Sequence, residues 1–239
     1  VSVESAEMTK HAINSFLALS VSFANELASI CEKVGADAKE VEIGLKSDIR
    51  IGMKAYLGPG GPFAGGTLAR DIKFLDNISK SSNLKNNIIS SVFKSNNNHK
   101  LWHQRIINEE FNNLIAQKKF LVLGLTYKPN TNTLRRSQSI ELIKWILENE
   151  GIVDCFDPVI SNSTHPILTK TTLLKKVSHL ESYDVIIVST PWKEFIDFFD
   201  FNTLERKIKE KSIIFDQHRL LNFNYTGKKI KYITVGFIK

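Results

Sequence analysis

The second half of the chain alternates short apolar runs with a helical pattern, and this alternation restricts the fold more than any other feature. The apolar runs have the length and bounds of buried strands, and they occupy 120–125, 152–156, 184–189, 213–216 and 230–235. A helical pattern with one apolar face fills 139–150 and ends at Gly151. Strands that alternate with helices form a parallel sheet with right-handed crossovers. We therefore predict an α/β fold with a parallel sheet from residue 118 onward.

The residues before 118 show helical periodicity instead, so we expect an all-helical first half. Apolar spacings of three and four predict one long helix with a single buried stripe, made of Ile13, Phe16, Leu17, Phe23, Ala24, Leu27, Ile30, Cys31 and Val34. Gly35 is placed to end that helix, and Asp37 with Glu40 to begin a second one. Further helices are expected after residue 71, with a break at the three asparagines 96–98.

Composition narrows the choice of partners. The 239 residues carry a formal net charge of +7 on scattered lysines, so we expect an anionic small ligand and no nucleic acid. Cys31 and Cys155 lie far apart in apolar settings, which is typical of buried thiols in a reducing compartment, and we expect a cytoplasmic protein. Neither a metal site nor a membrane span is expected, and His11 and the other histidines are interpreted as surface or core residues.

A glycine-rich segment is the strongest sign of function. Five glycines fall within 58–66, shortly before an apolar helical run that opens at Asp71. Such a cluster needs a backbone reason, and one reason is close approach of the backbone to a ligand at a helix N-terminus. Free N–H groups and the helix dipole favour phosphates and oxyanions at such an end. The alternative is a flexible solvent loop.

This segment resembles the glycine-rich loop of the UDP-glucose/GDP-mannose dehydrogenases, which reads Pro-Gly-x-Gly-Phe-Gly-Gly-Ser-Cys-x-x-(Lys)-Asp. The cysteine of that loop is the family's catalytic nucleophile, and Thr67 stands in its place here. Asp71 keeps the family's aspartate four residues on. The resemblance implies catalytic positions for Thr67 and Asp71 and substrate-binding positions for Phe63 and Gly65. A packing role is the alternative for Phe63.

Two motifs extend the resemblance through the helical half. Residues 6–14, AEMTKHAIN, are close to the family's helical signature, in which a lysine and an asparagine stabilise the developing oxyanion. Lys10 and Asn14 match that pair and share one helix face. Arg50 matches an arginine that reaches across the dimer to the partner's sugar nucleotide, where its planar fork suits phosphate.

Two more motifs lie in the sheet half. Residues 124–137 resemble a family motif whose lysine and arginine contact the sugar nucleotide and the cofactor, and Lys128 and Arg135 match them. The family's Asp-Gly-Arg is altered here, because His218 occupies the arginine position. Arg219 follows one residue later and is expected to bind substrate.

The order of these motifs implies the family's domain arrangement. We expect a central helical dimerisation domain at 1–117 and a C-terminal Rossmann-like nucleotide-sugar-binding domain at 118–239. The family's N-terminal NAD domain is expected to be absent from the chain, since we find no Gly-x-Gly-x-x-Gly between a strand and a helix. A truncated chain, a proteolytic remnant and a natural fragment all stay open. The resemblance also implies a homodimer and a role in polysaccharide biosynthesis.

Thr67 decides what reaction can be expected. Family enzymes oxidise a primary alcohol to a carboxylate in two NAD-dependent hydride transfers, the second through a thioester. A threonine hydroxyl ionises far less readily than a thiol, and no histidine stands out as its base. We expect an NAD-dependent oxidoreductase acting on the CH–OH group of a UDP- or GDP-sugar, which stops at the aldehyde or oxidises the aldehyde hydrate with Asp71 as base.

Three alternatives stay open. The first is a non-catalytic module that binds a nucleotide sugar and dimerises. The second is the full reaction through an ester of Thr67, and the third is a regulatory nucleotide-binding protein outside the family. By itself the chain is expected to be inactive, because the main NAD site would lie in the absent domain.

Overall fold

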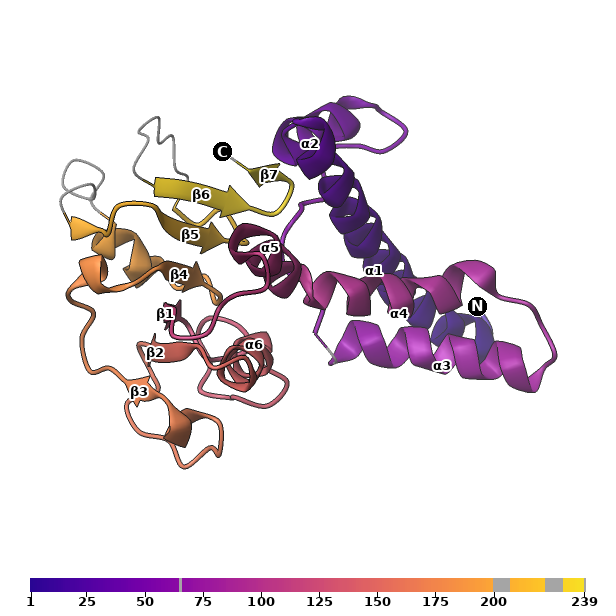
Figure 1. The fold of residues 1–239 in the computed structure, drawn as a ribbon. Coiled ribbons are helices and arrows are strands. Elements are labelled where there is room, and N and C mark those ends of the chain that lie inside the picture. Colours follow the sequence, from indigo (N-terminus) through magenta and orange to yellow (C-terminus); the bar gives the residue numbers. More distant parts are fainter. Residues whose placement is uncertain (65, 200–206, 222–229, 239) are drawn as a thin grey trace. The chain divides into compact units, whose positions relative to one another are not determined.

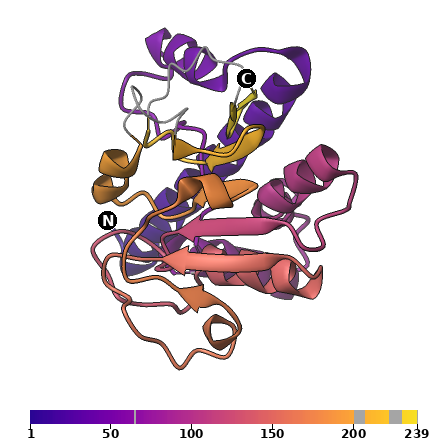
Figure 2. The ribbon, with the colours of Figure 1, turned by 60° about the vertical axis from the view of Figure 1, so that its left-hand side comes forward.

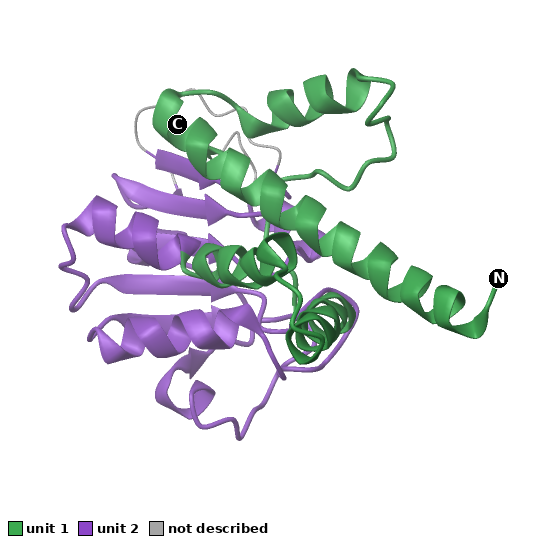
Figure 3. Ribbon diagram, turned by 90° about the vertical axis from the view of Figure 1, so that its right-hand side faces the viewer, with its two compact units in different colours: residues 1–101, 235–237 green, residues 102–234, 238–239 purple. Residues whose placement is uncertain are grey.

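The computed structural model describes residues 1–64, 66–199, 207–221 and 230–238 (Figure 1). They form two compact units, one of Val1–Leu101 with Val235–Phe237 and one of Trp102–Thr234 with Ile238–Lys239 (Figure 3). The division differs from the predicted domain ranges at 102–117, which we expected in the helical half and which cluster with the sheet. The physical reason is packing, since the Trp102 ring lies edge-on to Phe215 at 5.7 Å between centroids.

In its described residues the helical unit contains α1 (Val3–Val34), α2 (Ala38–Ser47), α3 (Thr67–Ser81) and α4 (Asn87–Lys100). α3 and α4 pack against each other and against α1 (Figure 1). Gly35 ends α1 at a left-handed φ of 75°, as predicted. Asp37 caps α2, as predicted, by accepting the Lys39 N–H.

The predicted buried stripe of α1 is wrong for its large side chains. Phe16 is 67% exposed and Phe23 is 50% exposed, and the other exposed members of the stripe are Ile13, Ile30 and Val34. The face that α1 buries carries small residues instead, which are Ser15, Ala18, Ser20, Val21, Ser22, Ala24, Asn25, Ala28 and Cys31. Small side chains let α3 and α4 approach closely, so the bulky stripe is left uncovered within the described chain.

The predicted helix break at 96–98 is also wrong. These asparagines lie inside α4, and the chain leaves helical structure at 82–86 instead. Asn96 is buried and hydrogen-bonded to the backbone of Phe63, so a tertiary contact overrides its weak helix propensity.

The second unit is built on a sheet with the strand order β3-β2-β1-β4-β5-β6-β7 (Figure 2). Its strands are β1 (Lys119–Leu123), β2 (Ile152–Phe156), β3 (Thr172–Leu173), β4 (Val185–Val188), β5 (Ser212–Asp216), β6 (Ile230–Thr234) and β7 (Phe237–Ile238). Every recorded pair from β3 to β6 is parallel, which confirms the predicted α/β class. β3 and β7 were not predicted.

Helices accompany the sheet in the described residues. They are α5 (Trp102–Phe111) and α6 (Gln138–Glu148), with short 3-10 helices η1 (Leu168–Lys170), η2 (Leu180–Ser182) and η3 (Lys193–Phe198). The order of strands reverses between β1 and β4, so a topological switch point lies there. Parallel sheets of this kind bind ligands outside the carboxyl ends of the strands at such a point.

No membrane span was expected, but one helix has the length and composition of one. By length and composition α1 is long and apolar enough to cross a membrane, and 39% of its most apolar window is buried inside the described protein. A core helix passes the same test. α1 packs against α3 and α4 through its small face, as a core helix does.

Candidate active site

A buried carboxylate joins α1 to α3 in the helical unit. Asp71 is fully buried, and its Oδ2 accepts a hydrogen bond of 2.5 Å from the Asn14 side-chain amide. Oδ1 lies 3.3 Å from Nδ1 of His11 and 3.5 Å from Nε of Arg70. Burial alone would raise the pKa of Asp71, but the Asn14 hydrogen bond and the nearby His11 and Arg70 outweigh it and hold that pKa below its usual range. The carboxylate is therefore ionised at neutral pH.

The structure adds His11 to this cluster, which sequence reasoning missed. Its ring also lies against Phe74, with 4.2 Å between the ring centroids. Nδ1 of His11 is enclosed beside Asp71, although the two atoms do not meet hydrogen-bond geometry. The signal was present in the sequence, because His11 and Asn14 are three residues apart and so face the same side of α1.

The other two predicted catalytic residues lie one helical turn from this contact. Lys10 is an exposed residue of α1, four positions before Asn14, and Thr67 is the exposed first residue of α3, four positions before Asp71. Gly66 precedes Thr67 and provides no side-chain cap to the first N–H groups of α3, and the first turn holds no acidic residue. The amino end of α3 thus presents N–H groups beside Thr67.

The glycine-rich loop holds two of the predicted substrate-binding residues, Phe63 and Gly65. Phe63 is buried with Ala18, Ile72 and Val92 in the core of the helical unit, so the structure supports the packing role for it. Gly65, the other predicted substrate contact in this loop, lies outside the described residues.

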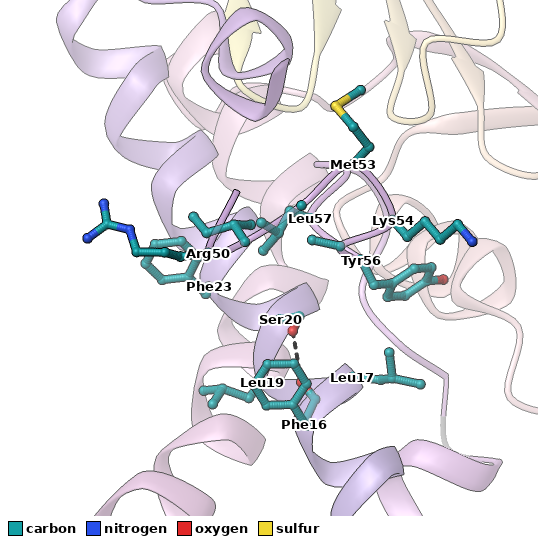
Figure 4. Close-up of a pocket in the computed structure, with 13 residues that line it drawn as sticks. Phe16, Leu17, Leu19, Ser20, Phe23, Arg50, Met53, Lys54, Tyr56 and Leu57 are labelled. Carbon is teal, nitrogen blue, oxygen red and sulfur yellow. Dashed lines mark hydrogen bonds between the residues drawn. The ribbon is translucent and has the colours of Figure 1, made fainter. Parts of the chain in front are cut away.

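A groove of about 950 Å³ lies between α1 and the segment 50–57 of the same unit (Figure 4). Its apolar lining includes Phe16, Phe23, Met53 and Tyr56. Met53 is 73% exposed and Tyr56 is 61% exposed, so the groove opens on an apolar surface. Arg50 stands at this groove and pairs with Asp48, with Nη2 to Oδ2 at 2.6 Å.

In the sheet unit, the turn after β1 lies at the switch point. Gly124 has a φ of 89°, and a Cβ placed on it would lie 2.5 Å from Cβ of Thr190 after β4, so the two turns touch. The Asp157 carboxylate, which follows β2, accepts the N–H groups of Leu125 at 2.7 Å and Thr126 at 3.2 Å. These contacts hold the carboxyl ends of β1, β2 and β4 together.

The remaining predicted contacts lie along this edge. Lys128 and Arg135 are exposed residues of the segment between β1 and α6. Nζ of Lys128 lies 5.4 Å from the ring centroid of Tyr127. Arg219 belongs to a turn after β5, where its N–H is bonded to the Asp216 carbonyl. The structure therefore places all three after the carboxyl ends of strands.

The turn after β1 does not fit the pyrophosphate of a dinucleotide. In such sites a glycine-rich turn offers free backbone N–H groups to the phosphates. Here the N–H groups of Leu125 and Thr126 already bind the negative Asp157 carboxylate. Among the described residues, no group of three or more His, Cys, Asp or Glu side chains could hold a metal ion.

Comparison with known proteins finds a matching family domain for each of the two units. The model of the UDP-glucose/GDP-mannose dehydrogenase family, central domain, matches residues 4–98, and that of the UDP binding domain of the same family matches residues 121–223. A UDP-glucose 6-dehydrogenase of Rickettsia bellii is 33% identical over 234 residues, which cover 97% of this chain and 54% of that protein. One from Bacillus subtilis is 30% identical over 98% of this chain and 53% of its own length.

The fold agrees with these matches. A UDP-glucose dehydrogenase structure from Pyrobaculum islandicum superposes with a TM-score of 0.79 at 25% identity, over 98% of this chain and 51% of that one. The chain spans about half the length of the curated relatives it matches. These matches cover the buried Asn14–Asp71 pair, the uncapped amino end of α3 and the parallel sheet. The chain belongs to the UDP-glucose/GDP-mannose dehydrogenase family.

Proposed function

We propose that this chain supplies the substrate-binding part of an oxidoreductase that acts on the CH–OH group of a nucleotide sugar. The observation that carries the proposal is the buried, ionised Asp71, held by Asn14 beside the uncapped amino end of α3. A fixed carboxylate and an amide donor, with Lys10 one turn away, suit a site that must orient a sugar hydroxyl and stabilise a developing oxyanion.

UDP-glucose is the substrate that the comparisons favour over a GDP-sugar. The domain model matched by the sheet unit is described as UDP binding, and the Rickettsia bellii and Bacillus subtilis relatives are named UDP-glucose 6-dehydrogenases. In the sheet unit, Lys128 and Arg219 follow strand ends, where a diphosphate would need positive charge. Arg50 offers a further guanidinium in the helical unit.

The reaction we propose ends at the aldehyde. Thr67 lies where the family's loop carries its cysteine, and a threonine hydroxyl is a weak nucleophile without a base. The alcohol would lose its hydroxyl proton to solvent water and a hydride from its carbon to the oxidised cofactor, which gives an aldehyde and needs no covalent intermediate. Lys10 and Asn14 would stabilise the oxygen during that step, and Asp71 would orient Asn14.

NAD is the cofactor that we propose, with its main site outside this chain. The turn after β1 supports this, because its N–H groups bind Asp157 and not a phosphate. NAD would supply the hydride acceptor. Arg135, which is exposed before α6, is the residue of this chain that we propose to contact it.

We further propose that the chain forms a homodimer through the helical unit. The support is the exposed apolar stripe of α1 together with the groove beside it, a surface on which Phe16, Phe23, Met53 and Tyr56 are all exposed. Contiguous apolar surfaces of this kind mark interaction sites. Cytoplasmic location, polysaccharide biosynthesis and the absence of nucleic-acid and membrane partners stay predictions.

A non-catalytic module that binds a nucleotide sugar and dimerises is the second candidate. Thr67 is the observation that favours it, since the family's nucleophile is replaced while Lys10, Asn14 and Asp71 are kept.

The experiment measures how many NADH are formed for each sugar that is consumed. The part of the Rickettsia bellii relative that lies outside the match is joined to this chain, and the fusion protein is supplied with UDP-glucose and NAD. We expect one NADH per sugar, and a Thr67→Cys variant is expected to approach two because it restores the thiol nucleophile. Two NADH per sugar with Thr67 in place would overturn the aldehyde proposal. UDP-glucose binding without any NADH would establish the non-catalytic module instead.

A further inference from the structure

The glycine-rich loop is held from two sides by side-chain amides of different helices. Oδ1 of Asn25, on α1, accepts the Gly60 N–H at 3.0 Å, and its Nδ2 donates to the Gly61 carbonyl at 3.4 Å. Oδ1 of Asn96, on α4, accepts the Phe63 N–H at 2.9 Å, and its Nδ2 donates to the Phe63 carbonyl at 3.1 Å. Each side-chain amide thus donates one hydrogen bond to the loop backbone and accepts one from it.

Three of these bonds are buried, and the bond from Asn25 to the Gly61 carbonyl is partly buried. Asn25 is 2% exposed and Asn96 is 5% exposed, and Nε2 of His99 on α4 adds a contact of 2.7 Å to the Gly60 carbonyl. Hydrogen bonds in such surroundings are strong, and a buried backbone group left without a partner is costly. The loop therefore has a well-determined path at Gly60 and at Phe63.

The second anchor lies directly ahead of the site. Only residues 64–66 separate Phe63 from Thr67, where α3 begins. Phe63 is also fixed by its ring in the core of the unit. That core also contains Ala69 and Ile72 of α3, so the Phe63 anchor and the first two turns of α3 belong to one packed cluster.

We propose that Asn25 and Asn96 are positioning residues of the nucleotide-sugar site, which clamp the glycine-rich loop so that the amino end of α3 is preorganised for the ligand. The ligand part of this inference rests on the proposed function. Preorganisation matters here because a loop ordered only on binding would lower the affinity by its ordering cost. Neither asparagine touches the ligand in this proposal.

The test compares the two clamping asparagines with Asn97, which neighbours Asn96 on α4. The 239-residue chain is studied as wild type, Asn25→Ala, Asn96→Ala and Asn97→Ala, the last an exposed residue of α4 that serves as control. Amide hydrogen exchange is followed by NMR at Gly60 and Phe63, and UDP-glucose affinity by calorimetry. An Asn96→Asp variant keeps the acceptor for the Phe63 N–H and serves as the conservative replacement.

We expect exchange about tenfold faster at Gly60 in Asn25→Ala and at Phe63 in Asn96→Ala, which corresponds to about 1.4 kcal/mol of lost local stability. UDP-glucose affinity is expected to fall about tenfold in both, with Asn97→Ala unchanged and Asn96→Asp in between. If Asn96→Ala does not fold, the comparison of Asn96→Asp with Asn97→Ala decides.

Two outcomes would overturn the proposal. One is unchanged exchange at Gly60 and Phe63 in the folded variants. The other is faster exchange with unaltered UDP-glucose affinity, which would make the asparagines purely structural. If the wild-type chain binds no UDP-glucose, the proposed function fails, and the exchange rates still decide whether the two asparagines clamp the loop.

Discussion

Asp71 shows how much the site depends on a single residue and its contacts. The sequence pattern identified Asp71, Asn14 and Lys10 through their family spacing. It did not reveal the bond between Asp71 and Asn14, which are 57 positions apart, nor the contact with His11. Local spacing predicts which residues share a helix face, whereas the partner on a second helix depends on how the helices pack.

The lowered pKa of Asp71 predicts a pH-dependent contribution to stability. A carboxyl whose pKa falls on folding stabilises the protein above its unfolded value and loses that effect as pH falls through the folded pKa. Asp71→Asn is expected to lower the free energy of unfolding by about 2 kcal/mol at pH 7, and by progressively less as pH falls below the unfolded carboxyl pKa of about 3.9. Urea unfolding at a series of pH values measures this difference.

Asp76→Asn provides the matched control on the same helix. Asp76 pairs with the exposed Lys80, so its removal is expected to cost less than about 1 kcal/mol. A loss for Asp71→Asn that does not shrink as pH is lowered below the unfolded carboxyl pKa would contradict the account of an ionised, paired Asp71.

At the scale of the element, α1 shows what periodicity predicts and what it omits. The spacing of apolar residues correctly predicted the helix and its end at Gly35. It placed the buried face wrongly, because a stripe of large apolar residues says which side avoids water and not which molecule covers it. Here the chain buries the small-residue side of α1 itself, and Phe16 and Phe23 stay exposed.

This arrangement predicts how substitutions on α1 act. The double variant Phe16→Ser/Phe23→Ser is expected to weaken self-association at least about a hundredfold, because large buried aromatics dominate interface energies, and to leave the melting temperature of the monomer nearly unchanged. Analytical ultracentrifugation measures the association. Leu84→Ser is the control, since Leu84 is a 63% exposed apolar residue outside this stripe and groove.

A wild-type chain that stays monomeric at high concentration would contradict the proposed dimer. Binding to lipid vesicles that is lost in the double variant would assign the α1 surface to a membrane instead.

Some strands were predicted from the sequence and others were not. The five longer runs were predicted because they are apolar, and β1, β4, β5 and β6 bury most of their residues in the sheet, while β2 buries Val153 and Cys155. β3 and β7 contain two residues each and carry no periodicity, so sequence alone could not show them. The misplaced break in α4 has a different cause, since Asn96 reads as a helix breaker until its partner Phe63 is known.

For the whole molecule, the two compact units follow the two family domains. The matched ranges end at residue 98 and resume at residue 121, and the unit boundary after Leu101 falls between them. The sequence could not place 102–117, because the affiliation of α5 depends on the contact of Trp102 with Phe215. The chain covers 54% of the length of its Rickettsia bellii relative.

The central claim is that this chain itself binds a UDP-sugar, and titration calorimetry of the 239-residue chain with UDP-glucose tests it most directly. We predict saturable binding of one ligand per chain with a dissociation constant of about 1–100 μM, which corresponds to roughly −8 to −5.5 kcal/mol. ADP-glucose is expected to bind more weakly, and Lys128→Ala to reduce the affinity for UDP-glucose. Absence of any saturable heat, or equal affinity for UDP-glucose and ADP-glucose, would contradict the account.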